Sequence, residues 1–240
     1  MERMNTSPSP GRARPFKAES SLRRLPLPYP RHDEVALLTH SKSPWGREAF
    51  VRLWLTEGAP YAFRGCPDVY EDVRAWIGSQ LDVYPKDITL VGSARLGFSL
   101  RPPPKYGEPF GGASDLDVAL VSPALFEELH ESFLRWRQDY QLGAVKPRNE
   151  KERGYWDDNL GRLDHYVGLG FLDAKKLPTF DRYPISKKMN NAMWALREKL
   201  RVTPGAPVPS GASVRVYRSW EQLVCRVAFN LDDVLRRIAA

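Results

Sequence analysis

The sequence predicts an α+β fold in which a small mixed β-sheet is flanked by helices, with a helical C-terminal part. Three short apolar runs, at 88–93, 115–121 and 213–219, have the length and pattern of strands. Longer segments around them repeat apolar residues every three to four positions, as on one face of a helix. The order is helix, strand, loop, strand and helix, followed by helices and one more strand. This order favours an α+β arrangement.

Two helices are predicted before the first strand. The segment GREAFVRLWLTEG, at 46–58, has an amphipathic pattern, and Ser43 and Pro44 form a suitable start for it. A second helix is predicted for 70–81, where the apolar residues share one face. The segment ITLVGS then predicts a short strand that ends at Gly92.

A loop, a strand and a helix follow. Residues 98–112 contain four prolines and three glycines, a composition that predicts no regular structure. The segment DLDVALV, at 115–121, predicts the second strand. Ser122 and Pro123 then begin a helix, because serine caps free N–H groups and proline is favoured at the first helical position.

The C-terminal part of the chain is less uniform. The pattern of 144–180 is mixed and predicts no definite element. Further along, a helix is predicted for 185–200 and a linker for 203–212. The strand at 213–219 leads into a final helix, predicted for 219–240.

Composition limits the class of protein. A chain of 240 residues can hold one domain with a core, or one domain with a small annex. No apolar run reaches the length of a membrane span and no secretory signal is recognisable, so we expect a soluble cytoplasmic protein without a membrane partner. The two cysteines and four histidines show no metal or redox spacing.

The net charge of +7 is concentrated at the N-terminus. Residues 1–31 hold seven basic and two acidic side chains and are rich in proline and serine. We interpret this segment as a flexible basic arm that precedes a core at 32–142 and a C-terminal helical part, with one returning strand, at 143–240. The arm could make weak electrostatic contacts with nucleic acid, and a merely solubilising segment is an equal alternative.

Two aspartates interrupt the strand at 115–121. Residues two apart in a strand project to the same face, so Asp115 and Asp117 point the same way, together with Ala119. Two carboxylates that close resist ionisation unless a cation lies between them. Mg²⁺ takes oxygen ligands and is often bound by one or two carboxylates together with substrate phosphates. Gly92 and Ser93, at the end of the neighbouring strand, can present N–H groups and a hydroxyl to an anion.

These two motifs resemble the nucleotidyltransferase superfamily, which has a DNA polymerase beta-like fold. The family pattern is an apolar strand ending in Gly-Ser, a helix start and a strand bearing Asp-x-Asp, and LVGSARLGFSL and SDLDVALV reproduce it within 88–126. The resemblance implies that Gly92 and Ser93 bind the triphosphate of an NTP. It also implies that Asp115 and Asp117 coordinate two Mg²⁺ ions, which align an acceptor hydroxyl on the α-phosphorus.

The sequence departs from the family pattern in two places. The interval from Ala94 to Ser114 is longer than is usual in the family, and the excess is the Pro/Gly loop, which is either a lid or acceptor guide or a surface excursion. The family also takes a third carboxylate from a later strand, but the outer face of 213–219 carries Arg215 and Tyr217 instead. Glu221 follows in the first turn of the last helix and is expected to face solvent. Either the third acid comes from 144–180, where the candidates are Asp157, Asp158, Asp164 and Asp173, or two aspartates suffice.

Four further residues are candidate ligands of the nucleotide. Arg95 could reach a phosphate or lie in solvent at a helix start, and Ser114 directly precedes the aspartate pair. Lys187, on the polar side of the helix predicted for 185–200, could hold the γ-phosphate or be merely solvated. Arg215 could bind phosphate or pair with Asp117.

The function predicted from these residues is Mg²⁺-dependent transfer of a nucleoside monophosphate from an NTP to an unknown hydroxyl acceptor. The alternative is a catalytically weak nucleotide-binding or partner-binding protein, such as a component of a bacterial defence or toxin–antitoxin system. The missing third acid favours the alternative, whereas the intact aspartate pair favours the enzyme. A nucleic-acid-binding module is a third hypothesis, which depends on the basic arm alone.

Overall fold

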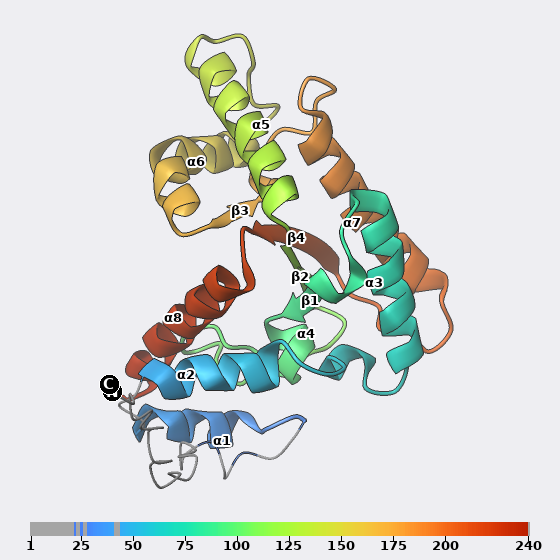
Figure 1. Cartoon of the computed structure of the whole chain (residues 1–240), viewed down its shortest axis with the longest axis vertical. Coiled ribbons are helices and arrows are strands. Elements are labelled where there is room, and N and C mark those ends of the chain that lie inside the picture. The colour runs from blue at the N-terminus through green and yellow to red at the C-terminus, as the bar shows by residue number, and fades with distance from the viewer. Residues whose placement is uncertain (1–21, 23–24, 26–27, 41–43, 240) are drawn as a thin grey trace, which may run out of the picture.

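A four-stranded mixed sheet lies at the centre of the computed structural model, which describes residues 22, 25, 28–40 and 44–239 (Figure 1). The strand order is β1-β2-β4-β3, with β2 and β4 parallel and the two outer strands antiparallel to their neighbours. The strands are β1 (Ile88–Val91), β2 (Asp115–Val121), β3 (Phe171–Asp173) and β4 (Gly211–Tyr217). The predicted α+β class with a small mixed sheet is confirmed.

One face of the sheet packs against four long helices and forms the larger core (Figure 1). These helices are α3 (Pro67–Leu81), α5 (Pro123–Gln141), α6 (Glu150–Gly168) and α7 (Pro184–Val202). Leu116, Val118 and Leu120 of β2 and Val214 and Val216 of β4 are buried on this face, as the two-residue alternation predicts.

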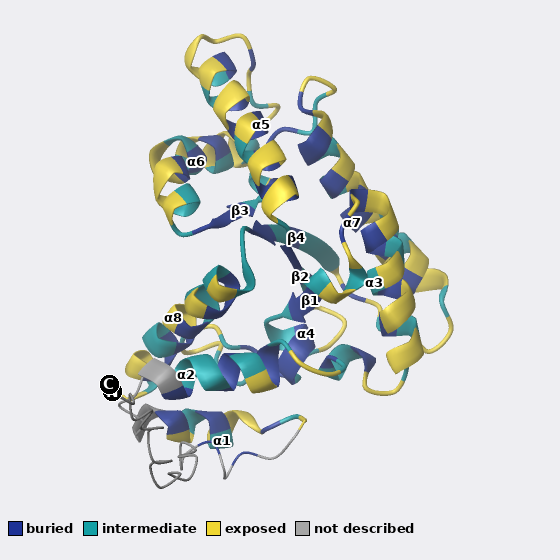
Figure 2. Cartoon of the chain, viewed as in Figure 1, coloured by how far each residue is buried: buried dark blue, intermediate teal, exposed yellow. Residues whose placement is uncertain are grey.

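The opposite face is covered by a second group of elements. These are α1 (His32–Ala36), α2 (Pro44–Phe50), a π-helical turn (Val51–Leu55), α4 (Ser93–Leu96) and α8 (Trp220–Ala239). Ala119, Val121, Phe171 and Tyr217 of the sheet are buried in this smaller core. The cover lies over the C-terminal ends of β2 and β4, so the polar residues at their N-terminal ends stay outside both cores (Figure 2).

Short 3₁₀ turns connect several of these elements. They are Leu37–His40, Tyr61–Phe63, Pro85–Asp87 and Ala174–Lys176. Among the residues that the structure describes, no helix combines the length and apolar character that crossing a membrane requires.

Most predicted elements are present with shifted ends. The segment predicted as one helix at 46–58 is α2 followed by the π-helical turn, and α3 begins three residues before the predicted 70–81. Ser122 Oγ accepts a hydrogen bond from the backbone N–H of Leu125 at 3.2 Å, which confirms the predicted cap of α5. The helix α6 and the strand β3 both lie in 144–180, where no element was predicted.

The N-terminal arm predicted for 1–31 lies largely outside the described residues. At its described end, Leu22 and Leu25 are buried in the smaller core, and the Tyr29 hydroxyl donates to the carbonyl of Ala59 at 3.0 Å. These described residues are thus packed against the rest of the structure. The sheet also crosses the expected boundary at 142/143, because β3 and β4 both return from the C-terminal part.

The Pro/Gly loop is an ordered excursion between α4 and β2. Phe98 and Pro109 form a β-bridge, and the backbone N–H of Phe110 donates to the Gly97 carbonyl at 2.8 Å. The Tyr106 hydroxyl donates to the carbonyl of His32 at 2.7 Å, which fixes the loop to the N-terminal elements. The loop therefore accounts for the long interval between the two sequence motifs.

Candidate functional site

The aspartate pair lies at the exposed start of β2. Asp115 and Asp117 project from the face opposite Leu116 and Val118, and Asp115 is exposed whereas Asp117 is half-buried. Both residues thus follow the alternation predicted from the sequence, with their neighbours anchored in the larger core.

Two serines orient the carboxylates. The Ser210 hydroxyl donates to Asp115 Oδ1 at 2.7 Å, and the Ser213 hydroxyl donates to Asp117 Oδ1 at 2.8 Å. Ser213 lies directly opposite Asp117 in the parallel pairing of β2 with β4, so its side chain is on the same face. The Oδ2 atom of each aspartate accepts no hydrogen bond from a described residue and keeps its coordination capacity.

The Gly92 turn approaches one of these carboxylates. Val91 pairs with Asp117 across β1 and β2, and Gly92 follows with φ 70° and ψ −150°, a conformation that side chains rarely allow. A Cβ atom at this position would lie 3.1 Å from Asp117 Oδ2. Glycine is therefore required for the backbone angle and also leaves room beside the carboxylate.

Two serines of these motifs lie close to the aspartates: Ser93 follows Gly92, and Ser114 directly precedes Asp115. Ser93 begins α4 directly after Gly92, and its hydroxyl forms no hydrogen bond with a described residue. Ser114 Oγ accepts from the backbone N–H of Gly111 at 3.1 Å, and its carbonyl accepts from the backbone N–H of Ser210 at 3.0 Å. Ser114 thus closes the turn that leads into β2.

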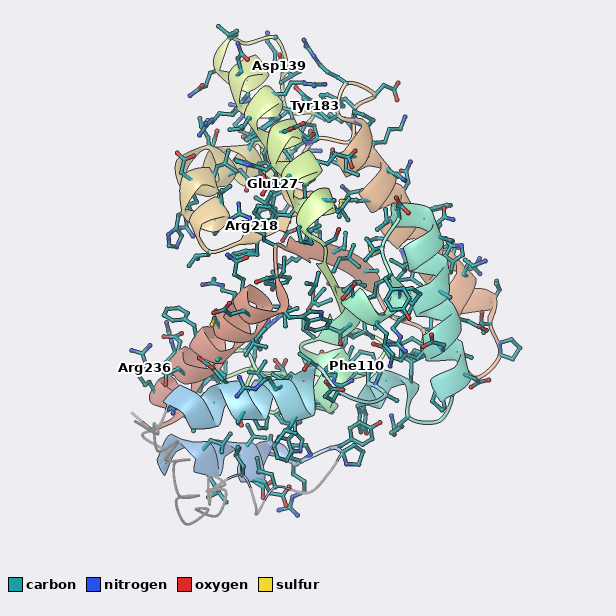
Figure 3. The ribbon with its side chains drawn as sticks, viewed as in Figure 1. Phe110, Glu127, Asp139, Tyr183, Arg218 and Arg236 are labelled. Atoms are coloured by element: carbon teal, nitrogen blue, oxygen red, sulfur yellow. The ribbon has the colours of Figure 1, made fainter. Side chains whose placement is uncertain are left out.

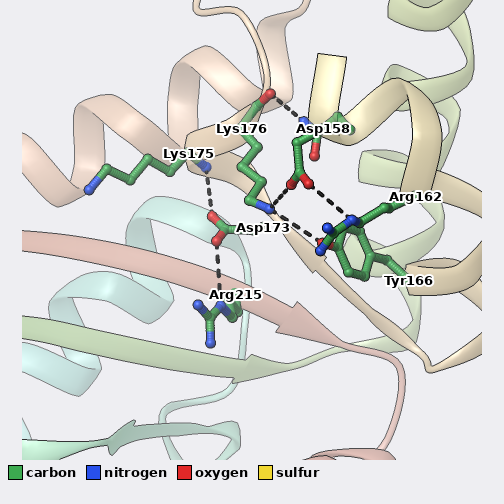
Figure 4. A network of polar contacts seen from close by, with 8 residues as sticks. Asp158, Arg162, Tyr166, Asp173, Lys175, Lys176 and Arg215 are labelled. Atoms are coloured by element: carbon green, nitrogen blue, oxygen red, sulfur yellow. Dashed lines mark hydrogen bonds and ion pairs between the residues drawn. The ribbon is translucent and has the colours of Figure 1, made fainter. Parts of the chain in front are cut away.

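An arginine occupies the strand beside the aspartates. Arg215 of β4 lies opposite Ala119 on one side and opposite Asp173 of β3 on the other. Its Nε donates to Asp173 Oδ2 at 3.4 Å (Figure 4). Burial disfavours the guanidinium charge, but Asp173, Tyr217 and Asp117 together outweigh it and raise the pKa of Arg215. The same charge offsets part of the repulsion between the acids.

The structure separates the four candidates for a third acid. Asp173 alone among them lies on the sheet, but its strand is two removed from β2, which corresponds to about 10 Å. Arg215 lies between them. The others are on α6, where Asp157 accepts from Tyr140, Asp158 pairs with Lys176 and Arg162, and Asp164 pairs with Arg137. Among the described residues, no group of three or more His, Cys, Asp or Glu side chains is placed to hold a metal ion.

Arg95 is placed differently from the sequence expectation. Its side chain is 3% exposed, and it donates to the carbonyls of Trp54 at 3.0 Å and Gly58 at 2.7 Å. Burial lowers the pKa of the guanidinium. The residue thus ties the helix after Gly92 to the N-terminal elements, and its predicted contact with a phosphate is not supported by this placement.

Lys187 also lies away from the aspartates. Its ammonium pairs with Asp181 near the start of α7. This end of α7 is joined to the last turns of α5, where the Tyr183 hydroxyl donates to Asp139 Oδ2 at 2.7 Å (Figure 3). Because α5 leaves the sheet at Pro123, its rise places Asp139 about 24 Å away from the sheet. The predicted γ-phosphate contact of Lys187 therefore has no support in this arrangement.

The donor atoms present fit a hard divalent cation. Asp115, Asp117, Ser210 and Ser213 supply only oxygen atoms, which is the set that Mg²⁺ prefers. Two carboxylates that retain free oxygens and face solvent leave room for water and phosphate ligands. The pair would hold the metal, with the remaining coordination positions open to a substrate.

The role of Ser210 and Ser213 was not predicted. Ser213 could have been inferred from the alternation of SVRVY, which places it on the same face as Arg215. Ser210 belongs to the linker and has no such periodicity. Glu221, by contrast, lies exposed in the first turn of α8, where Ser219 Oγ accepts from the Gln222 N–H at 3.2 Å, and this confirms its expected place.

Comparison with known proteins adds no relative. No protein-family model, no curated protein and no solved structure matches the chain.

Proposed function

We propose that the chain is a Mg²⁺-dependent nucleotidyltransferase that moves a nucleoside monophosphate from an NTP to a hydroxyl acceptor. The observation that supports this most strongly is the contact geometry of Gly92, whose backbone lies against the Asp117 carboxylate at the open end of β2. A phosphate chain could then contact the turn while its metal is held by the aspartates.

Each residue has a defined part in this proposal. Asp115 and Asp117 hold the cations, and the hydroxyls of Ser210 and Ser213 fix the direction of the two carboxylates. Gly92 and Ser93 lie where they can bind the triphosphate. When bound, Mg²⁺ would stabilise charge on the phosphates and lower the pKa of the acceptor hydroxyl. The acceptor hydroxyl would lose its proton to solvent as its oxygen forms a bond to the α-phosphorus, the bond from that phosphorus to the bridging oxygen would break, and pyrophosphate would leave.

A second candidate function is nucleotide binding without efficient turnover. Arg215 is the observation that favours it, because a guanidinium stands on the strand where the family supplies its third carboxylate. Asp173 faces that guanidinium and is separated from the aspartate pair by one strand. Without a third carboxylate, no side chain would act as the base for the acceptor hydroxyl. A bound nucleotide would then act as a signal or as a link to a partner.

The distinguishing experiment measures pyrophosphate release and label transfer from each of the four NTPs with Mg²⁺. The wild type is compared with Asp117→Asn and with Glu128→Gln, a matched change of an exposed acid on α5, outside the site. The enzyme proposal predicts release that Asp117→Asn abolishes and Glu128→Gln preserves. Metal-dependent nucleotide binding without pyrophosphate release supports the second candidate. If neither binding nor release is detected, both candidate functions are refuted.

A further inference from the structure

A separate pocket of about 660 Å³ lies between the end of α6 and the first half of α8. It adjoins the C-terminal ends of β2 and β4, whereas the aspartate pair is at their N-terminal ends. The length of β2 puts about 20 Å between the two places. Its volume falls in the range of pockets that bind small molecules.

Arg226 is the distinctive side chain of this pocket. Its guanidinium carbon lies 4.9 Å from the ring centre of Phe171 and 5.6 Å from that of Phe229. Within the part of the chain that the structure describes, Arg226 has no hydrogen bond or ion pair. A guanidinium that rests on aromatic rings keeps its N–H groups available, and these match the paired oxygens of a carboxylate or a phosphate.

The second arginine of the pocket is already oriented. Arg218 donates to Glu127 Oε1 at 3.2 Å, and its guanidinium carbon lies 4.4 Å from the ring centre of Phe126 (Figure 3). His165 also lines the pocket, and Glu221 is the one acid among its lining residues. Glu127 offsets the charge of Arg218, so Arg226 is the lining arginine that has no ion pair with a described acid, and an anionic ligand would supply that partner.

The remaining lining offers an apolar surface to the body of a ligand. Leu169 and Phe229 are large apolar residues of the lining, and Phe229 is 60% exposed even though the Arg226 guanidinium lies near its ring. Gln222 also lines the pocket, but its Oε1 is buried and accepts no hydrogen bond from a described residue, so this oxygen is not open to a ligand. Gly170, with φ 71°, leaves the space that the Gln222 amide occupies.

We propose that this pocket binds a small organic anion with an aromatic or aliphatic body, held by the Arg226 guanidinium at its carboxylate or phosphate group. The apolar wall would take the body. The proposal does not depend on the nucleotidyltransferase activity, since none of its residues belongs to the aspartate site.

The test is a fluorescence titration of the full chain with 1-anilinonaphthalene-8-sulfonate, an aromatic anion. N-phenyl-1-naphthylamine, which has the same rings without the sulfonate, is titrated in parallel. The variants are Arg226→Gln and the matched control Arg236→Gln, which removes an exposed arginine at the other end of α8 (Figure 3). Circular dichroism and thermal melting establish that each variant is folded.

The proposal predicts one saturable site for the anionic dye in the wild type. Arg226→Gln should weaken it about tenfold or more, as expected for loss of a charge-assisted pair, and Arg236→Gln should not change it. The neutral dye should be insensitive to Arg226→Gln, and phenyl phosphate or benzoate should displace the anionic dye. The absence of saturable binding, or an equal loss in the two variants, overturns the proposal. If Arg226→Gln fails to fold, Arg226→Lys serves instead, with an intermediate loss expected.

Discussion

Replacing Arg95 with methionine tests whether this residue is a structural link or a phosphate ligand. The side chain is buried and donates two hydrogen bonds, to the carbonyls of Trp54 and Gly58. Hydrogen bonds from a charged donor contribute roughly 1.5–3 kcal/mol each. Removing the cost of burying the charge returns part of this, so we expect the free energy of unfolding to fall by about 2–4 kcal/mol.

The assay is urea unfolding followed by tryptophan fluorescence. With a slope of about 3 kcal/mol per molar urea for a chain of this size, the midpoint should fall by about 1 M. Arg197→Met, an exposed arginine on α7, is the control and should change the midpoint little. Nucleotide affinity of folded Arg95→Met should stay within a few-fold of wild type. A variant with normal stability and lost nucleotide affinity would refute the reasoning.

Three further predictions concern stability and the site. Tyr183→Phe removes the hydrogen bond to buried Asp139, so thermal unfolding should show a loss of about 1–3 kcal/mol, and an unchanged melting curve would contradict this. Gly92→Ala strains the backbone and crowds the adjacent carboxylate, so calorimetry should show weaker nucleotide binding; wild-type affinity would argue against a site at the turn. The hydrogen bond donated by Lys176 lowers the pKa of Asp158 in the folded protein. The ionised Asp158 therefore stabilises the fold fully above about pH 4, the ordinary pKa of an aspartate, and this stabilisation is lost as the pH falls through the lower pKa of the folded state. The difference in free energy of unfolding between wild type and Asp158→Asn should therefore shrink below about pH 4. Urea unfolding at a series of pH values measures this difference, and a difference that stays constant with pH would contradict the prediction.

The strands with strong alternation were predictable, and the short one was not. In β2, Asp115 and Asp117 alternate with apolar residues, and this alternation indicates which face of the strand is exposed. In β3, the three residues Phe171–Asp173 are too few to show a period, so the strand is defined by its pairing with β4. Periodicity contains no information on such long-range pairing, and the order β1-β2-β4-β3 could not be read from the sequence.

Side-chain partners were harder to predict than elements. Arg95 and Lys187 both carry the charge that a phosphate requires, but the carbonyls of Trp54 and Gly58 bind one, and Asp181 binds the other. Trp54 and Gly58 are distant from Arg95 along the chain, so the sequence does not show that they meet. The direction in which α7 carries Lys187 away from the aspartates depends on tertiary packing, which local sequence does not show either. Local motifs could place the aspartate pair but not the groups that surround it.

Calorimetric titration of Mg²⁺ with each NTP tests the central claim, that Asp115, Asp117 and the Gly92 turn hold a metal–nucleotide complex. The titration is done on the wild type and on the double variant Asp115→Asn and Asp117→Asn, with EDTA in place of Mg²⁺ as the metal-free control. The account predicts saturable binding of at least one NTP that requires Mg²⁺ and is lost in the double variant. Equal binding by wild type and variant, or no binding of any NTP, would contradict it.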